Sequence, residues 1–143
     1  MASSTLQLTV QRIIAVLAAV TAITNVVGTR IYGSYLATVR NAQFPAISIH
    51  LIEGSRRVDQ AGHEVFLMQI DLWFKAEGAN PPTWDDVMTL WADVLDTLHA
   101  VGGIQSSTLR MLRMTNVGQG PQLYEPDTSV LHLPTRWQVR ALV

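Results

Sequence analysis

The stretch Val65–Lys75 constrains the fold more than any other part of the sequence. Its side chains alternate between apolar and polar almost without interruption. Such alternation predicts a β-strand with one buried face, because successive side chains of a strand point to opposite sides. The apolar face holds Phe66, Met68, Ile70, Leu72 and Phe74, and the polar face holds Gln69, Asp71 and Lys75.

A helix pattern follows this strand. Thr83 is placed to cap a helix, and Asp86 stands at the reciprocal position of a capping box. Apolar side chains then recur at the 3.6-residue spacing of an amphipathic helix, which we expect to span 84–101 and to be closed by Gly102-Gly103. The apolar stripe consists of Trp84, Val87, Met88, Trp91, Val94, Leu95 and Leu98. A strand followed by such a helix predicts a sheet covered by helices.

The rest of the chain supplies one more helix and three more strands. An N-terminal helix is expected over 4–26, capped by Ser3 or Ser4 and ended by Gly28. The further strands are expected at Ala46–Glu53, Leu109–Asn116 and Val130–Leu142. The polar connection 54–62 makes the first of these a hairpin with Val65–Lys75. We expect 29–42 to be irregular or weakly helical and Val117–Ser129 to be a loop.

These elements predict one α+β domain spanning 1–143. Its sheet is mainly antiparallel, with about four strands, and carries the N-terminal helix and the second amphipathic helix on one face. The apolar run Ile13–Ala22 is shorter than the roughly 18 residues of a membrane span, so we interpret it as part of a buried helix in an intracellular protein.

Composition narrows the function. The net charge of −1 points to neither nucleic acid nor an anionic membrane as a partner. Only 15% of residues are charged and 48% are hydrophobic, a balance typical of chains that bury surface between subunits. The chain has no cysteine, which excludes disulfides, thiol catalysis and cysteine-bound zinc.

The sequence offers little catalytic chemistry. His50, His63, His99 and His132 lie in different predicted elements without metal-ligand spacing. We interpret Asp96 and His99 as a surface pair one helical turn apart, with a shared metal as the alternative. The acidic residues Asp85, Asp86, Asp93 and Asp96 are interpreted as a solvated helix face. Glycine-containing segments lack the residues of phosphate-binding or dinucleotide-binding loops. We therefore expect no enzyme and no cofactor.

Arginines are the more informative set. Arg136 and Arg140 share the polar face of the last strand, and Arg56-Arg57 stand at the tip of the predicted hairpin. Arg110 and Arg113 lie on opposite faces of their strand. Arginine suits protein interfaces because its planar fork pairs with carboxylates, although each single arginine is equally compatible with a solubilising surface role.

Several of these pieces resemble, in this order, the phage tail terminator (tail completion) family of long-tailed bacteriophages. They are the N-terminal helix followed by Gly28-x-Arg30-Ile31-Tyr32, then Phe44-Pro45 leading into Ile47-Ser48-Ile49, then the alternating strand ending at Leu72-Trp73, an amphipathic helix, and the final strand. The loop Val117–Ser129 is the segment that matches this pattern least well.

The resemblance implies a small domain that forms a homo-hexameric ring. Such a ring caps the tube built from the major tail tube protein, ends its polymerisation, and presents a surface to the head–tail connector or stopper protein. DNA passes through it without specific binding. The implied location is the head–tail junction of the virion, after assembly in the host cytoplasm and without a membrane.

Within this hypothesis, we expect the hairpin tip to contact a neighbouring subunit or the tube, with Arg136 and Arg140 as further interface candidates. The tip consists of Arg56, Arg57, Val58, Asp59 and Gln60. Two alternatives stay open at this point. One is a neck, connector or other tail assembly protein, and the other is a small oligomeric enzyme or ligand-binding domain that uses Asp96, His99 or His132.

Overall fold

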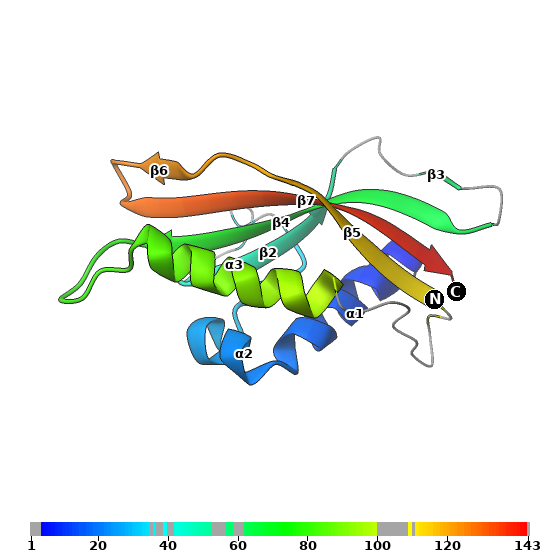
Figure 1. Ribbon diagram of the computed structural model, residues 1–143, viewed down its shortest axis with the longest axis horizontal. Helices are drawn as coiled ribbons and strands as arrows, with labels where there is room; N and C mark the ends of the chain where they lie inside the picture. Colours follow the sequence, from blue (N-terminus) through cyan, green and yellow to red (C-terminus); the bar gives the residue numbers. More distant parts are fainter. Residues whose placement is uncertain are drawn as a thin grey trace.

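A seven-stranded sheet forms the body of the protein in the computed structural model (Figure 1). The structure describes residues 4–34, 36, 39, 42–52, 57–58, 62–99, 109 and 111–142. The main strands are β2 (Ala46–Leu51), β4 (Glu64–Lys75), β5 (Met111–Gln119) and β7 (Val130–Leu142). They match the four predicted strands, and the pairs β2–β4, β4–β7 and β5–β7 are all antiparallel.

Three short strands complete the sheet: β1 (Ile31–Tyr32), β3 (Arg57–Val58) and β6 (Leu123–Glu125). The path runs β1-β2-β4-β7-β5, while β3 pairs with β4 and β6 pairs with β7. Because β1 is parallel to β2, the sheet is mixed rather than wholly antiparallel. The predicted number of strands was too low, since segments of two or three residues are too short to show alternation.

Helices α1 (Thr5–Ala18), α2 (Thr21–Val27) and α3 (Trp84–His99) all lie on one face of the sheet, as expected (Figure 1). The apolar face of β4 is buried against them, from Phe66 through Phe74. Trp137 of β7 is fully buried in the same core and meets Trp91 of α3 edge to face, with ring centroids 5.9 Å apart. The apolar face predicted for Val65–Lys75 is therefore part of the main hydrophobic core.

The predicted N-terminal helix is two helices. Ser4 caps α1 in a capping box with Gln7, as expected, but the helix ends at Ala18 and α2 leaves at an angle of 96°. A straight helix over 4–26 would run about 34 Å, whereas the break returns the chain to the sheet. Ile13 of α1 and Ile23 of α2 are thereby buried in one core. Gly28, with φ 57°, ends α2 as predicted.

The same break bears on membrane insertion. Among the described residues no single helix is long and apolar enough to cross a membrane. Helices α1 and α2 together have the length and composition of a span, but the bend of 96° separates them.

The segment Gly28–Tyr32 positions the start of the sheet. Arg30 donates from Nε to the carbonyl oxygen of Pro45 at 2.7 Å and from Nη2 to the carbonyl oxygen of Val26 at 3.3 Å. One side chain thus ties the end of α2 to the entry of β2. Residues 31–32 form β1 beside β2, so the expectation of an irregular segment was wrong there.

The prediction that Val117–Ser129 forms a loop was also wrong in part. Strand β5 continues to Gln119, and β6 pairs with the first residues of β7. Between the two strands the chain passes Pro134 of β7, which has no N–H to offer a partner strand. Gly120 lies against this proline: its N–H donates to the Pro134 carbonyl oxygen at 2.8 Å, and a Cβ at Gly120 would lie 2.6 Å from the proline ring.

Candidate partner-binding surfaces

The face of the sheet away from the helices, here called the outer face, is polar along most of its length. It has two halves. One half is a buried cluster centred on Asp71 of β4, and the other carries exposed arginines on β5 and β7. Apolar side chains of Leu36, Ala42 and Phe44 pack beside the Asp71 half, around Trp73 and Val130.

Asp71 is fully buried and gathers the polar groups around it. Its Oδ1 accepts a hydrogen bond from Nε2 of Gln69 at 2.8 Å and lies 2.8 Å from Nε2 of His132. Its Oδ2 lies 3.5 Å from the Ser48 hydroxyl and 3.6 Å from Nδ1 of His50. A buried carboxylate is costly unless it is paired and hydrogen-bonded, and these contacts on three strands meet that need.

Trp73 closes this cluster. Its indole Nε1 donates to the Ser48 hydroxyl at 2.8 Å, and its ring stacks on His132 with centroids 3.7 Å apart and planes 7° from parallel. The Asp71 cluster, defined as Ser48, Gln69, Asp71, Trp73 and His132, therefore joins β2, β4 and β7 on their outer face. Because each of its members bonds another member, the cluster is a structural element of the sheet.

The sequence placed Asp71 and His132 on a polar strand face, which is correct, but their burial was missed. The one sequence feature that pointed to this burial was Trp73, which lies on the same strand face as Asp71. A large aromatic side chain can cover polar neighbours. Only the strand register brings Ser48 opposite Asp71 and His132 opposite Trp73. Spacing along one strand does not contain that information.

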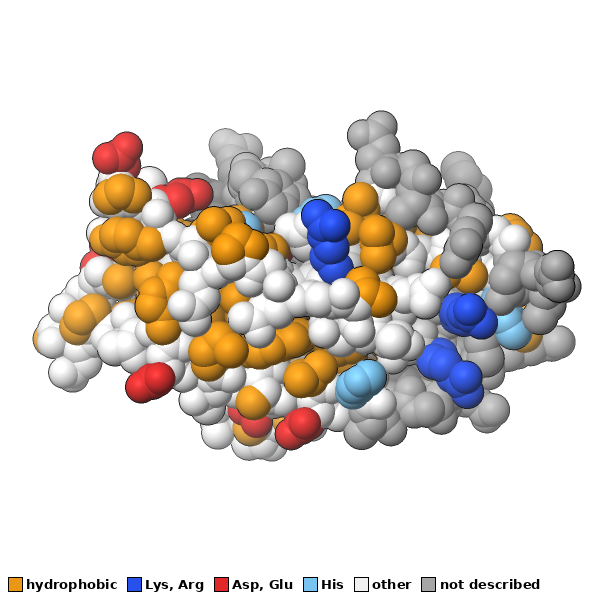
Figure 2. All heavy atoms as spheres, turned by 45° about the horizontal axis from the view of Figure 1, so that its top comes forward, with side chains coloured by type: hydrophobic (Ala, Val, Ile, Leu, Met, Phe, Trp, Pro, Cys, Tyr) orange, Lys and Arg blue, Asp and Glu red, His pale blue; other side chains and the backbone are white. Residues whose placement is uncertain are grey.

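The arginine half of the outer face is open to solvent. Arg113, Arg136 and Arg140 are exposed, and Figure 2 shows basic side chains along this part of the surface, with most of the visible acidic ones elsewhere. Arg113 of β5 pairs directly with Arg140 of β7 in the strand register. A hollow of about 170 Å³, here called the arginine hollow, is lined by Arg113, Thr115, Gln138 and Arg140.

The register also relates the predicted tip to these arginines. Arg57 pairs with Val65, and Val65 pairs with Arg140, so the backbones of Arg57, Arg140 and Arg113 share one row across the sheet. Val58 is 64% exposed. Arg56, Asp59, Gln60 and Arg110 lie outside the described residues, as do Gly102-Gly103.

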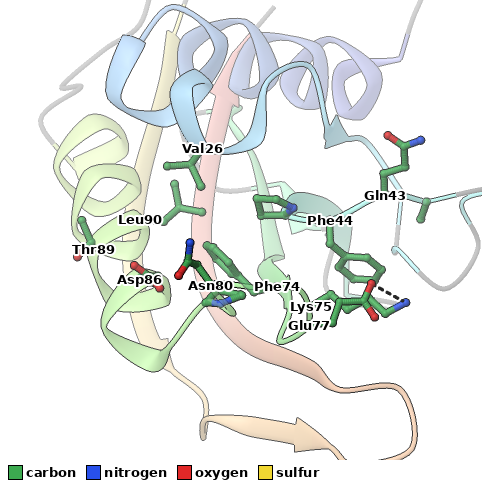
Figure 3. A pocket seen from close by; sticks show the side chains of 13 residues that line it. Val26, Gln43, Phe44, Phe74, Lys75, Glu77, Asn80, Asp86, Thr89 and Leu90 are labelled. Atoms are coloured by element: carbon green, nitrogen blue, oxygen red, sulfur yellow. Dashed lines mark ion pairs between the residues drawn. The ribbon is translucent and has the colours of Figure 1, made fainter.

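Two further surfaces are exposed at or near the end of the sheet where β6 lies. A groove of about 760 Å³ lies between α2, the start of α3 and the segment 42–45, with Phe44, Phe74 and Leu90 on its walls (Figure 3). Lys75 and Glu77 form an ion pair of 3.5 Å in its lining. Along the β5–β6 edge, Val117, Leu123 and Tyr124 are 41–53% exposed.

The candidates for enzymatic chemistry do not converge. His132 belongs to the Asp71 cluster, whereas Asp96 and His99 lie on α3, on the other side of the sheet. No ion pair joins Asp96 to His99 within the described chain, so the predicted surface pair does not form. The His99 ring instead meets Trp137 edge to face at 6.3 Å. Across the described residues, no group of three or more histidine or acidic side chains has the geometry to hold a metal ion.

Comparison with protein families gives the decisive match. Residues 11–141 match the family model described as "Tail completion protein gp17". The chain belongs to this tail completion family. Its role is therefore that of a structural protein of the phage tail, and its location is the tail of the virion.

The fold has a counterpart among solved structures. A chain from the virion of a native gene transfer agent particle matches with a TM-score of 0.65 and 16% identity, over 97% of this chain and 98% of that one. At that identity the match shows a shared fold. Comparison with curated protein sequences gives no match.

Proposed function

We propose that this tail completion protein forms a hexameric ring that caps the tail tube, ends tube polymerisation, and provides the surface that joins the tail to the head connector. The observation that carries the proposal is the family match over residues 11–141. In this proposal 1–143 acts as one domain, which contributes no catalysis, and DNA passes through the ring without specific binding.

The surfaces support contacts with other proteins. Apolar side chains at the β5–β6 edge, among them Tyr124, are too exposed to serve this chain's own core. An unpaired sheet edge with apolar side chains favours association with another chain. A closed ring also needs two different surfaces on each copy, and the two sides of this sheet differ because the helices cover only one of them (Figure 1).

The direct test is tube assembly in the presence of the purified chain. Tail tube subunits are polymerised with and without it, and tube lengths are measured by electron microscopy. The proposal predicts tubes of limited length, each with a cap at one end. Unlimited tubes without caps would contradict it.

The predicted tip is tested separately. We expect the double variant Arg56→Glu/Arg57→Glu to keep the fold, measured by circular dichroism, and to lose tube capping, because it reverses two charges at a proposed contact. Asp127→Lys, a charge reversal in the β6–β7 turn, is the control and should cap like the wild type. Capping by the double variant at wild-type level would remove the tip from the interface.

A neck or connector role is the second candidate. The fold shared with a chain of a phage-like virion is compatible with either position along the tail axis. Pull-down with purified tail tubes against pull-down with the portal-side connector distinguishes them. Retention on the connector alone would favour the second candidate.

A further inference from the structure

The groove between α2, the start of α3 and the segment 42–45 has the size and the walls of a docking site. Its volume of about 760 Å³ falls in the range of roughly 300 to 1,000 Å³ found for ligand-binding clefts. Figure 3 shows Leu90 of α3 on one side and Phe44 on the other, with Phe74 between them. Such walls are suited to hold an apolar side chain of another segment.

The lining of this groove is acidic as well as apolar. Its charged groups are the carboxylates of Glu77 and Asp86 and the ammonium group of Lys75, which give a formal charge of −1. Lys75 is paired with Glu77 at 3.5 Å. Asp85 is exposed beside Asp86 in the first turn of α3. The groove therefore favours a segment that combines an apolar side chain with positive charge.

The predicted tip, residues 56–60, has this chemistry. Val58 of β3 is 64% exposed, more than any other large apolar side chain among the described residues. The sequence places Arg56 and Arg57 before it and Asp59 after it, so the tip carries a formal charge of +1. Arginine is also enriched at protein interfaces. The tip is thus complementary to the groove both in its apolar side chain and in its charge.

One copy cannot bring its own tip and groove together. Strand β3 pairs with the first residues of β4, whereas Phe74 and Lys75 at the end of β4 line the groove. A strand rises about 3.3 Å per residue, so the two ends of β4 are separated by about 30 Å. In Figure 1 β3 and the start of α3 lie toward opposite ends of the long axis. The tip can therefore reach only the groove of another copy.

We propose that the tip of one copy docks in the groove of the next copy, with Val58 as its apolar anchor and its positive charge against the acidic lining. The inference rests on the proposed ring. A tip at one end and a groove at the other form a heterologous contact, which is the kind that closes into rings. The partner of the tip is then a second copy of this chain and not the tail tube.

Charge also decides against DNA as the occupant. A phosphate backbone would be repelled by the carboxylates in and beside the groove. A segment of the tail tube protein is the alternative occupant, which the experiments below distinguish from a second copy.

Proximity is tested by crosslinking, for which a chain without cysteine is well suited. Val58→Cys places a thiol at the tip, and Asn80→Cys places one at an exposed position of the groove lining. The two single variants, one of them with a size tag, are mixed with tail tubes and treated with a short bis-maleimide. We expect a crosslinked heterodimer, and the double variant should give a ladder of oligomers. The control pair of Val58→Cys with Thr115→Cys, an exposed position on the outer face, should remain uncrosslinked.

Charge exchange tests whether the tip meets the groove or the tube. Glu77→Lys makes the lining basic and should raise the protein concentration needed for half-maximal tube capping by about fivefold. Added to Arg56→Glu/Arg57→Glu, the same change should restore part of the lost capping, because the reversed charges attract again. Asp96→Lys, an exposed position at the other end of α3, is the control and should restore nothing.

The outcomes separate the inference from the proposed function. If the wild type caps tubes while the Val58–Asn80 crosslink is absent and Glu77→Lys restores nothing, the inference is wrong and the ring stands. If Arg56→Glu/Arg57→Glu forms normal rings by electron microscopy but does not hold tubes, the tip binds the tube and the inference is again wrong. If the wild type neither caps tubes nor forms rings, both the proposed function and the inference are overturned.

Discussion

The two halves of the outer face lie on neighbouring strands of one sheet and are both polar, yet one half is buried and the other is exposed to solvent. In one half, Asp71 is buried and its polar neighbours bond each other. In the other half, Arg113 and Arg140 are exposed and stand directly opposite each other. The first half gathers its polar groups inside the chain, whereas the second presents two like charges at directly opposed, exposed positions of adjacent strands.

The difference shows how a strand sequence divides its polar positions between buried contacts and exposed surface. A buried polar cluster stabilises one arrangement of strands because any change leaves a donor or acceptor without a partner. A pair of like charges at directly opposed positions of adjacent strands does not by itself stabilise the sheet.

Replacing Asp71 by alanine should have the largest effect on stability. The change removes the acceptor shared by Gln69 and His132 and leaves both without their shared partner in a buried site. We expect the free energy of unfolding to fall by about 3 kcal/mol, measured by urea denaturation followed by circular dichroism. Asp127→Ala, an exposed position, should change it by less than about 0.5 kcal/mol. Equal effects at the two positions would contradict the structural role of the cluster.

Trp73→Phe should have an intermediate effect. Phenylalanine keeps an aromatic ring beside His132 but loses the hydrogen bond from Nε1 to the Ser48 hydroxyl. We expect a loss of about 1 to 2 kcal/mol in the same unfolding assay. Adding Ser48→Ala should cost little more, because the two residues share one interaction. Fully additive losses would show that the bond is not the source of the effect.

Arg113→Thr should give the smallest change, and of opposite sign. Removing one of two facing charges and introducing a residue suited to strands should raise the free energy of unfolding by about 0.5 kcal/mol. Arg136→Thr is the matched control, because Arg136 pairs with Gln69 and Gly118 and faces no like charge in the register. A loss of stability in Arg113→Thr would show that Arg113 serves the fold.

Much of the fold followed from the sequence because long elements carry strong periodic signals. The alternation in Val65–Lys75 and Val130–Leu142 predicted two central strands and their buried faces, and the apolar stripe predicted α3. Caps at Ser4 and Gly28 were also identified correctly, since cap chemistry is local. Order along the chain was sufficient to suggest the tail completion family.

Features that depend on tertiary contacts were not predictable. The turn after Ala18 contains no glycine or proline that would mark it in the sequence. It forms because both α1 and α2 pack on one core. Strands β1, β3 and β6 form only where a long strand offers an edge. The Asp71 cluster and the Arg113–Arg140 pair depend on cross-strand register, so the sequence could name Arg113, Arg136 and Arg140 but could not show that Arg113 and Arg140 stand directly opposite each other.

Cryo-electron microscopy of the purified chain mixed with its tail tubes tests the central claim most directly. The account predicts a six-fold cap seated on one end of each tube, with the Asp71 cluster unchanged inside each subunit. Uncapped tubes with free protein in solution would contradict the proposed role in ending the tail.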